Sequence, residues 1–151
     1  MIKLDFMMDL CIDYRVRVVG PGPFGARQLF LVQGGEFKGP RLQGQVLPSG
    51  GDWMLVGQDN VGRLDVRLML ETTDEALIYM QFRGVLELND LVAAAASGTR
   101  EPEFEDAYFV TQPRFETGDT RYAWLNRSVG LAEGKVGQNR AWYRVYRAVQ
   151  G

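Results

Sequence analysis

Histidine is absent from this chain of 151 residues, and cysteine occurs once, at Cys11. Without histidine, no Ser-His-Asp or Cys-His catalytic machinery and no histidine-containing zinc site can form. A single cysteine excludes an intrachain disulfide and a thiolate cluster, and its apolar surroundings predict a small buried hydrophobic side chain. We therefore expect neither a metal site nor a cofactor.

Long apolar runs are missing as well. No stretch approaches the length of a transmembrane helix without a charge, and Asp5, Asp9 and Asp13 interrupt the N-terminal run where a signal peptide would need an apolar segment. The formal net charge of −2 argues against nucleic acid, whose binding depends on a basic face. We expect a cytoplasmic protein with no nucleic-acid or membrane partner.

The chain has instead a strong alternation of apolar and polar residues. From Leu4 to Tyr14 every second residue is apolar, and Gly62–Thr72 repeats the pattern with arginine and acidic residues between the apolar ones. A period of two is typical of half-buried strands. Nine such segments are expected: Leu4–Val18, Leu29–Lys38, Arg41–Leu47, Asp52–Val56, Gly62–Thr72, Ala76–Leu88, Phe104–Phe115, Tyr122–Glu133 and Ala141–Val149.

One short helix is predicted among these strands, at Leu88–Ser97, with Asn89 as its N-cap and Gly98 after its end. Gly34-Gly35 predicts a bulge, and Asp74-Glu75 a turn. Short turns between evenly spaced strands predict a single all-β domain, residues 1–151, that closes as an antiparallel up-and-down barrel. A two-sheet sandwich is the alternative.

Five motifs in order resemble the domain-of-unknown-function 3237 family, which is also named uncharacterised protein family 0311. They are GPRLQGQVLPSGGDW (Gly39–Trp53), LDVR (Leu64–Arg67), ALIY (Ala76–Tyr79), PRFETGDTRYAWLNRS (Pro113–Ser128) and VYR (Val145–Arg147). The resemblance covers roughly the whole chain. It implies a small soluble antiparallel β-barrel and supplies no catalytic residue.

The stretch Pro113–Asn126 is the first candidate site. If a strand follows the turn at Gly118, then Tyr122, Trp124 and Asn126 share one face, and two aromatic rings with an amide are typical of a small-molecule pocket. The alternative is that the two rings only fill a barrel core. Arg41, Trp53 and Tyr79 complete the predicted substrate-binding set.

A second candidate combines Asp65 and Arg67 with Arg83 and Tyr79 on the next strand. A hairpin centred on Asp74-Glu75 would place residues whose numbers sum to about 149 opposite one another, so that Arg67 lies near Arg83. Facing inward, this cluster could stabilise an enolate or bind a carboxylate. Facing outward, it is a solvated charged surface.

Asp52 is the third candidate. It could act as a general base whose pKa is raised by Trp53 as a desolvating wall. The alternative is a turn aspartate that accepts backbone N–H groups beside Gly50-Gly51.

Three functions stay open. The first is a cofactor-free acid–base enzyme, an isomerase, lyase, cyclase or dehydratase that acts on a small apolar or aromatic carbonyl compound. In this enzyme Asp52 or Asp65 moves protons, while Arg67, Arg83 and Tyr79 hold developing negative charge. The second is a non-catalytic carrier or sensor barrel, and the third an interaction protein whose barrel is packed solid. The expected partner is a small molecule, and a homodimer is left open.

Overall fold

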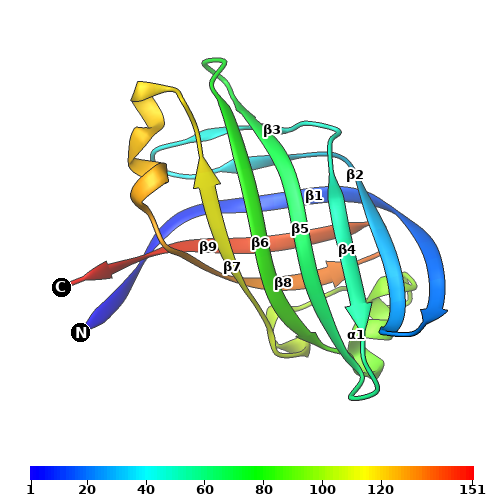
Figure 1. Cartoon of the computed structure of the whole chain (residues 1–151). Helices are drawn as coiled ribbons and strands as arrows, with labels where there is room; N and C mark the ends of the chain where they lie inside the picture. Colours follow the sequence, from blue (N-terminus) through cyan, green and yellow to red (C-terminus); the bar gives the residue numbers. More distant parts are fainter.

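The computed structural model describes residues 1–151 and shows a ring of nine antiparallel strands (Figure 1). In Figure 1, β5, β6 and β7 run across the front, while β1, β8 and β9 cross behind them. The strands are β1 (Ile2–Gly22), β2 (Gly25–Lys38), β3 (Gln43–Val46), β4 (Gly51–Val56), β5 (Val61–Thr72), β6 (Leu77–Glu87), β7 (Phe109–Glu116), β8 (Gly130–Gly137) and β9 (Arg140–Gln150). The predicted antiparallel barrel is confirmed, and pairing of β1 with both β2 and β9 closes the ring.

The strands β3 and β4 share one place in the barrel wall. Both pair with β2 on one side and with β5 on the other. The break between them falls at Gly50, whose φ is +67° and where a Cβ atom would overlap the carbonyl oxygen of Arg67. The wall therefore has eight positions, one of them built from two short strands.

The predicted bulge and turns are confirmed. The β1–β2 register shifts between Asp13 and Tyr14, opposite Gly34, which has a φ of +152°. Such positive values are readily adopted by glycine. In the β5–β6 hairpin the numbers of paired residues sum to 148, as in Asp65 opposite Arg83, one less than expected.

The helix α1 (Asp90–Ala96) lies inside the predicted range, and the Asn89 side chain accepts the Val92 N–H as its N-cap. Two further segments are helical where strands were expected: η1 (Phe104–Asp106) and η2 (Thr120–Arg127), both 3₁₀ helices. The predicted strands over Phe104–Phe115 and Tyr122–Glu133 are therefore wrong in their first halves.

Local side-chain bonds explain the helix η2. The Asp119 carboxylate accepts the Arg121 N–H at its start, and the Asn126 amide makes two hydrogen bonds with the backbone of Thr117, of 2.8 and 2.9 Å. These bonds offer the backbone an alternative to a strand ladder. Leu125, which is fully buried, anchors the segment in the core.

The interior of the barrel holds the hydrophobic core, a cluster of 26 buried residues. The core positions follow the alternation: Leu64, Val66, Leu68 and Leu70 of β5 point inward, and the residues between them point outward. None of the helices has the length and apolar character that crossing a membrane requires.

Candidate functional site

The barrel encloses a cavity of about 540 Å³ at one end of the core. Eighteen of its 24 lining residues are hydrophobic, among them Phe30, Met54, Val66 and Phe109. No lysine or arginine lines it, although the chain has 17 of them. The cavity therefore suits an apolar and uncharged molecule of modest size.

The mouth of the cavity lies where β1 leaves β9. Their pairing ends at Asp13 and Arg140, and the following half of β1 pairs with β2 alone. Solvent-exposed lining residues gather there, among them Val16 of β1, Asn60 and Asn139 in two hairpin turns, and Ala93 of α1. The helix α1 thus covers this end of the barrel (Figure 1).

Asp52 of β4 points into this cavity. It pairs with Phe30 of β2 and Val66 of β5, which also face inward. The β4–β5 ladder is interrupted just after this residue, and Asp52 Oδ1 accepts the freed N–H of Asp65 at 3.0 Å. The Asp52 side chain therefore accepts a hydrogen bond that a backbone carbonyl would accept in an uninterrupted ladder.

The environment makes Asp52 a proton acceptor suited to neutral pH. Burial among apolar side chains raises the pKa of its carboxyl from 3.8 to about 7, against the smaller opposing effect of the Asp65 N–H bond. The nearby Asp65 charge adds a further rise. A carboxyl with this pKa exchanges protons readily at neutral pH, as a general base must.

Two tyrosines line the same cavity. Tyr143 of β9 is buried edge-on against Phe82 and Phe109, with ring centroids 5.1 and 5.5 Å away. Burial, and then the charge of Asp52, raise the pKa of Tyr143 well above its usual value. Tyr14 of β1 donates to the carbonyl of Gly137 at 2.8 Å, and burial raises its pKa to about 12. Both phenols therefore stay protonated and can donate hydrogen bonds.

Neither tyrosine is among the site residues predicted from the sequence. Each occupies an inward position of its strand among aliphatic neighbours, Tyr14 after Ile12 and Tyr143 between Ala141 and Val145. The available signal was a tyrosine at a strand position where the alternation predicts an inward apolar side chain. A buried hydroxyl at such a position needs a hydrogen-bond partner or a function.

Trp53 does not form the predicted wall around Asp52. As the next residue of the same strand it lies on the outer surface, 38% exposed, and Arg27 donates to its backbone carbonyl. Consecutive side chains of a strand point to opposite faces. The desolvating walls are instead the inward residues Phe30, Met54 and Val66.

The cluster of Asp65, Arg67, Arg83 and Tyr79 lies on the outer face of β5 and β6. Asp65 pairs with Arg83, whereas Arg67 pairs with Gln81 and not with Arg83. The cluster therefore takes the outward orientation that the sequence left open, and contributes no cation to the cavity.

The predicted aromatic face of Tyr122, Trp124 and Asn126 does not form, because η2 replaces the strand. The Tyr122 hydroxyl donates to Asp74 at 2.8 Å, and the Arg41 guanidinium stacks 3.7 Å above the Trp124 ring. Both rings pack against the outside of the core cluster, and none of these residues lines the cavity.

The chain is thus a closed antiparallel β-barrel whose largely apolar cavity contains the carboxyl group of Asp52. The chain belongs to the family described as "Protein of unknown function (DUF3237)", whose model matches residues 2–148. It is 36% identical over 103 residues to a UPF0311 protein of Rhodopseudomonas palustris, covering 67% of this chain and 66% of that protein. The match thus spans slightly less than two thirds of the relative.

Solved structures share the fold over nearly the whole chain. A conserved protein of unknown function from Rhodopseudomonas palustris has a TM-score of 0.91 at 26% identity, covering 99% of both chains. A beta-barrel like protein from Acinetobacter baumannii has a TM-score of 0.83 at 27% identity, covering 99% of this chain and 97% of that one. An enzyme from Penicillium herquei has a TM-score of 0.72 at 17% identity, covering 98% of this chain and 95% of that one. This match shows a shared fold and nothing about function.

Proposed function

We propose that this protein is a cofactor-free acid–base enzyme of the isomerase, lyase or cyclase type, acting on a small, uncharged, apolar or aromatic carbonyl compound. The proposal rests on one observation above all. Asp52, with a pKa of about 7, lines an apolar cavity that also contains the protonated Tyr143. A base and a neutral donor in one apolar pocket are the two groups that proton transfer next to a carbonyl needs.

In the proposed reaction the Asp52 carboxylate removes a proton from the carbon beside the carbonyl group. The Tyr143 hydroxyl donates a hydrogen bond to the carbonyl oxygen, which gains negative charge as an enolate forms. Return of the proton to another carbon gives an isomer, loss of a neighbouring group gives a lyase product, and internal attack gives a ring. Asp52 thereby keeps the proton-transfer role expected of Asp52 or Asp65, and Tyr143 takes the charge-holding role expected of Arg67, Arg83 and Tyr79.

The absence of cations from the lining supports an uncharged substrate. Asp52 and Asp90 are the acids of the lining, and no lysine or arginine offsets them. A carboxylate substrate would enter an apolar site next to a like charge, which is costly.

Proton exchange tests the proposal without knowledge of the product. A panel of small aromatic and aliphatic ketones with acidic C–H bonds is incubated with the protein in D₂O, and deuterium uptake is followed by NMR. We expect Asp52→Asn to lower catalysed exchange by about 10²–10⁴-fold, and Tyr143→Phe to lower it less, while both variants still bind the ketones. Exchange by Asp52→Asn at the wild-type rate would exclude Asp52 as the base.

The variant Arg67→Ala tests whether proton exchange takes place in the cavity or at the charged cluster on the outer face. Exchange that survives this change assigns the chemistry to the cavity, and exchange lost with intact folding would return it to the Asp65–Arg83 cluster.

A non-catalytic carrier remains the second candidate, because the predominantly apolar lining would suffice for binding. Wild-type protein that binds ketones but exchanges no proton above background would favour the carrier.

A further inference from the structure

The first residues of β1 form a sheet edge with no partner. On one side, Ile2 to Phe6 pair with β9 from Gln150 to Tyr146. On the other side, pairing with β2 begins only at Asp9, and Gly39 packs against the carbonyl of Met7. The open edge therefore extends over Ile2–Phe6, which projects from the barrel together with the end of β9 (Figure 1).

The backbone of this edge has groups available for pairing. The Ala148 N–H of β9 donates to Val129 of β8 at 2.8 Å, so Ala148 directs its backbone groups away from β1. Leu4 and Ala148 therefore form a non-hydrogen-bonded pair, and the N–H and C=O of Leu4 point to the open side. Ile2 and Phe6 share this parity, and unpaired N–H and C=O groups of this kind are a template for another strand.

The side chains of the edge are unusually apolar for an unpartnered strand. Ile2, Leu4 and Phe6 are 67%, 49% and 43% exposed and lie on one face, where Phe6 contacts Tyr146 edge-on. Exposed apolar groups on an edge strand invite association, and native edges are usually protected by charges or prolines.

The charges of the edge match a second copy of itself. If two edges pair antiparallel with Leu4 on the two-fold axis, Lys3 of one chain lies opposite Asp5 of the other, twice, and Ile2 lies opposite Phe6. Neither Lys3 nor Asp5 forms an ion pair within its own chain. Opposite charges directly across a sheet stabilise the pairing, and a two-fold interface requires such self-complementarity.

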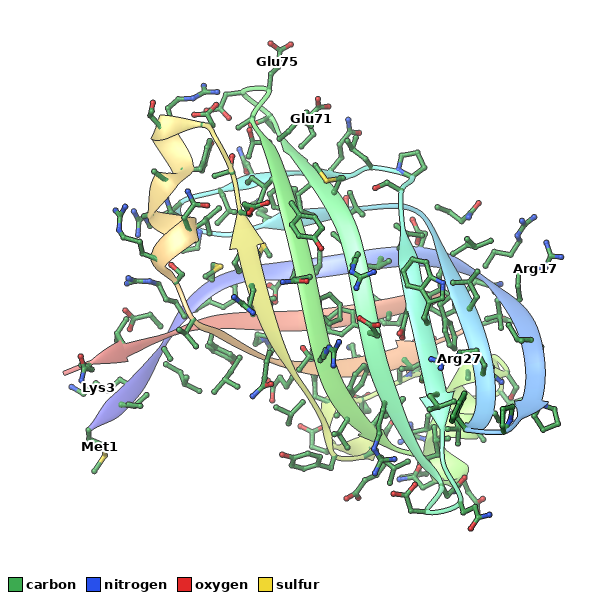
Figure 2. All side chains as sticks on the ribbon, viewed as in Figure 1. Met1, Lys3, Arg17, Arg27, Glu71 and Glu75 are labelled. Atoms are coloured by element: carbon green, nitrogen blue, oxygen red, sulfur yellow. The ribbon has the colours of Figure 1, made fainter.

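The other open edge of β1 lacks this property. Beyond the end of β9, the outer edge of β1 carries Arg15 and Arg17, followed by Gly20-Pro21-Gly22. Antiparallel self-pairing about Val16 would place arginine opposite arginine, and Pro21 cannot donate to a ladder. Figure 2 shows Lys3 and Arg17 at opposite ends of the molecule, so the two edges can be tested separately.

We propose that the protein forms a homodimer through antiparallel pairing of the edge strands Ile2–Phe6, with Lys3 of each chain facing Asp5 of the other. The pairing adds about six backbone hydrogen bonds and continues the sheet from one barrel into the next. The interface is short, so a concentration-dependent dimer is expected and not an obligate one.

Charge reversal tests the register. Lys3→Asp makes the edge wholly acidic and Asp5→Lys makes it wholly basic, and each is expected to weaken its homodimer by about tenfold or more, measured by sedimentation velocity from low micromolar to near-millimolar protein. Mixed together, the two variants have complementary edges again. Native mass spectrometry of the mixture should show the heterodimer in excess over both homodimers.

The control is Arg17→Asp, a charge reversal on the other open edge, which should leave the dissociation constant unchanged. Circular dichroism tests whether each variant is folded, which is expected because the three side chains are exposed and form no ion pair within the monomer. Wild-type protein that is monomeric at all concentrations would overturn the proposal and leave the edge to another partner. Dimers insensitive to Lys3→Asp, sensitive to Arg17→Asp, or without heterodimer preference would also overturn it.

Discussion

Asp52 illustrates what a single position can reveal from sequence. Its place after the Gly50-Gly51 turn suggested either a base or an acceptor of backbone N–H groups, and it is in fact such an acceptor, bonded to Asp65 across the sheet. Its depth in the cavity depended on the break between β3 and β4, which brings Phe30 and Val66 alongside. Residue type and local turn chemistry do not encode that long-range arrangement.

The raised pKa of Asp52 predicts a stability that falls as pH rises. Between the usual pKa of 3.8 and the folded value of about 7, the folded protein keeps a proton that the unfolded chain releases. The free energy of unfolding therefore decreases over this window, by about 1.4 kcal/mol for each unit of pKa difference at most, and levels off above pH 7. Urea unfolding of wild type and Asp52→Asn at intervals from pH 4 to pH 8 measures the difference.

Asp52→Asn retains an oxygen to accept the Asp65 N–H but cannot ionise, so other carboxyl groups cancel when the two proteins are compared. The variant should gain stability relative to wild type as pH rises to 7. Parallel pH profiles for both proteins would show that Asp52 titrates normally. In the proposed reaction the same group must be ionised, so turnover should rise through pH 7, as the stabilising contribution of protonated Asp52 is lost.

The helical segments show where strand periodicity misleads. Alternation located each strand of the wall at least in part, because burial on one face of a sheet imposes a period of two. The same alternation of Tyr122, Trp124 and Asn126 arises in η2, where capping by Asp119 and the Asn126–Thr117 bonds hold a 3₁₀ helix. The short helix α1 was predictable, since the Asn89 cap and the alanines that follow act locally.

The position of α1 at the mouth predicts that its inner face controls access. Ala93 lines the cavity and Leu91 does not, although both are exposed. Ala93→Trp should slow the association of an aromatic ketone such as acetophenone by about tenfold or more by filling the mouth, at a helix-propensity cost of only about 0.5 kcal/mol. Stopped-flow binding measures the rate.

Leu91→Trp is the matched control, because it adds the same side chain to the solvent side of the same helix. It should bind the ketone at the wild-type rate. Equal rates for both variants would place the route into the cavity elsewhere.

The barrel as a whole keeps its cations out of its cavity. All lysines and arginines lie outside the lining, and five arginines form ion pairs, as Arg140 does with Asp13 at 2.6 Å. The sequence revealed the barrel but not this separation, because the face that each arginine occupies depends on which strand parity points inward.

This separation predicts selectivity by ligand charge. At pH 8 a neutral aromatic ketone should stabilise the folded protein and so raise its melting temperature. At a hundredfold excess over its dissociation constant, the gain in the free energy of unfolding is about 2.7 kcal/mol. Benzoate, of similar size but anionic, should give no shift, because it would meet the Asp52 carboxylate without a cation. Thermal unfolding monitored by tryptophan fluorescence compares them, and stabilisation by benzoate equal to that by the ketone would contradict the prediction.

The two ends of the chain meet at one edge of the barrel, where Met1 and Gly151 are hydrogen-bonded to each other. The polypeptide therefore traces an almost closed loop, and a short peptide linker could join its ends without disturbing any strand. New ends could then be opened in a hairpin turn such as Asp74-Glu75, away from both the mouth and the edge strand. The fold therefore admits circular permutation, in which the strands keep their cyclic order around the ring and only the strand that begins the chain changes.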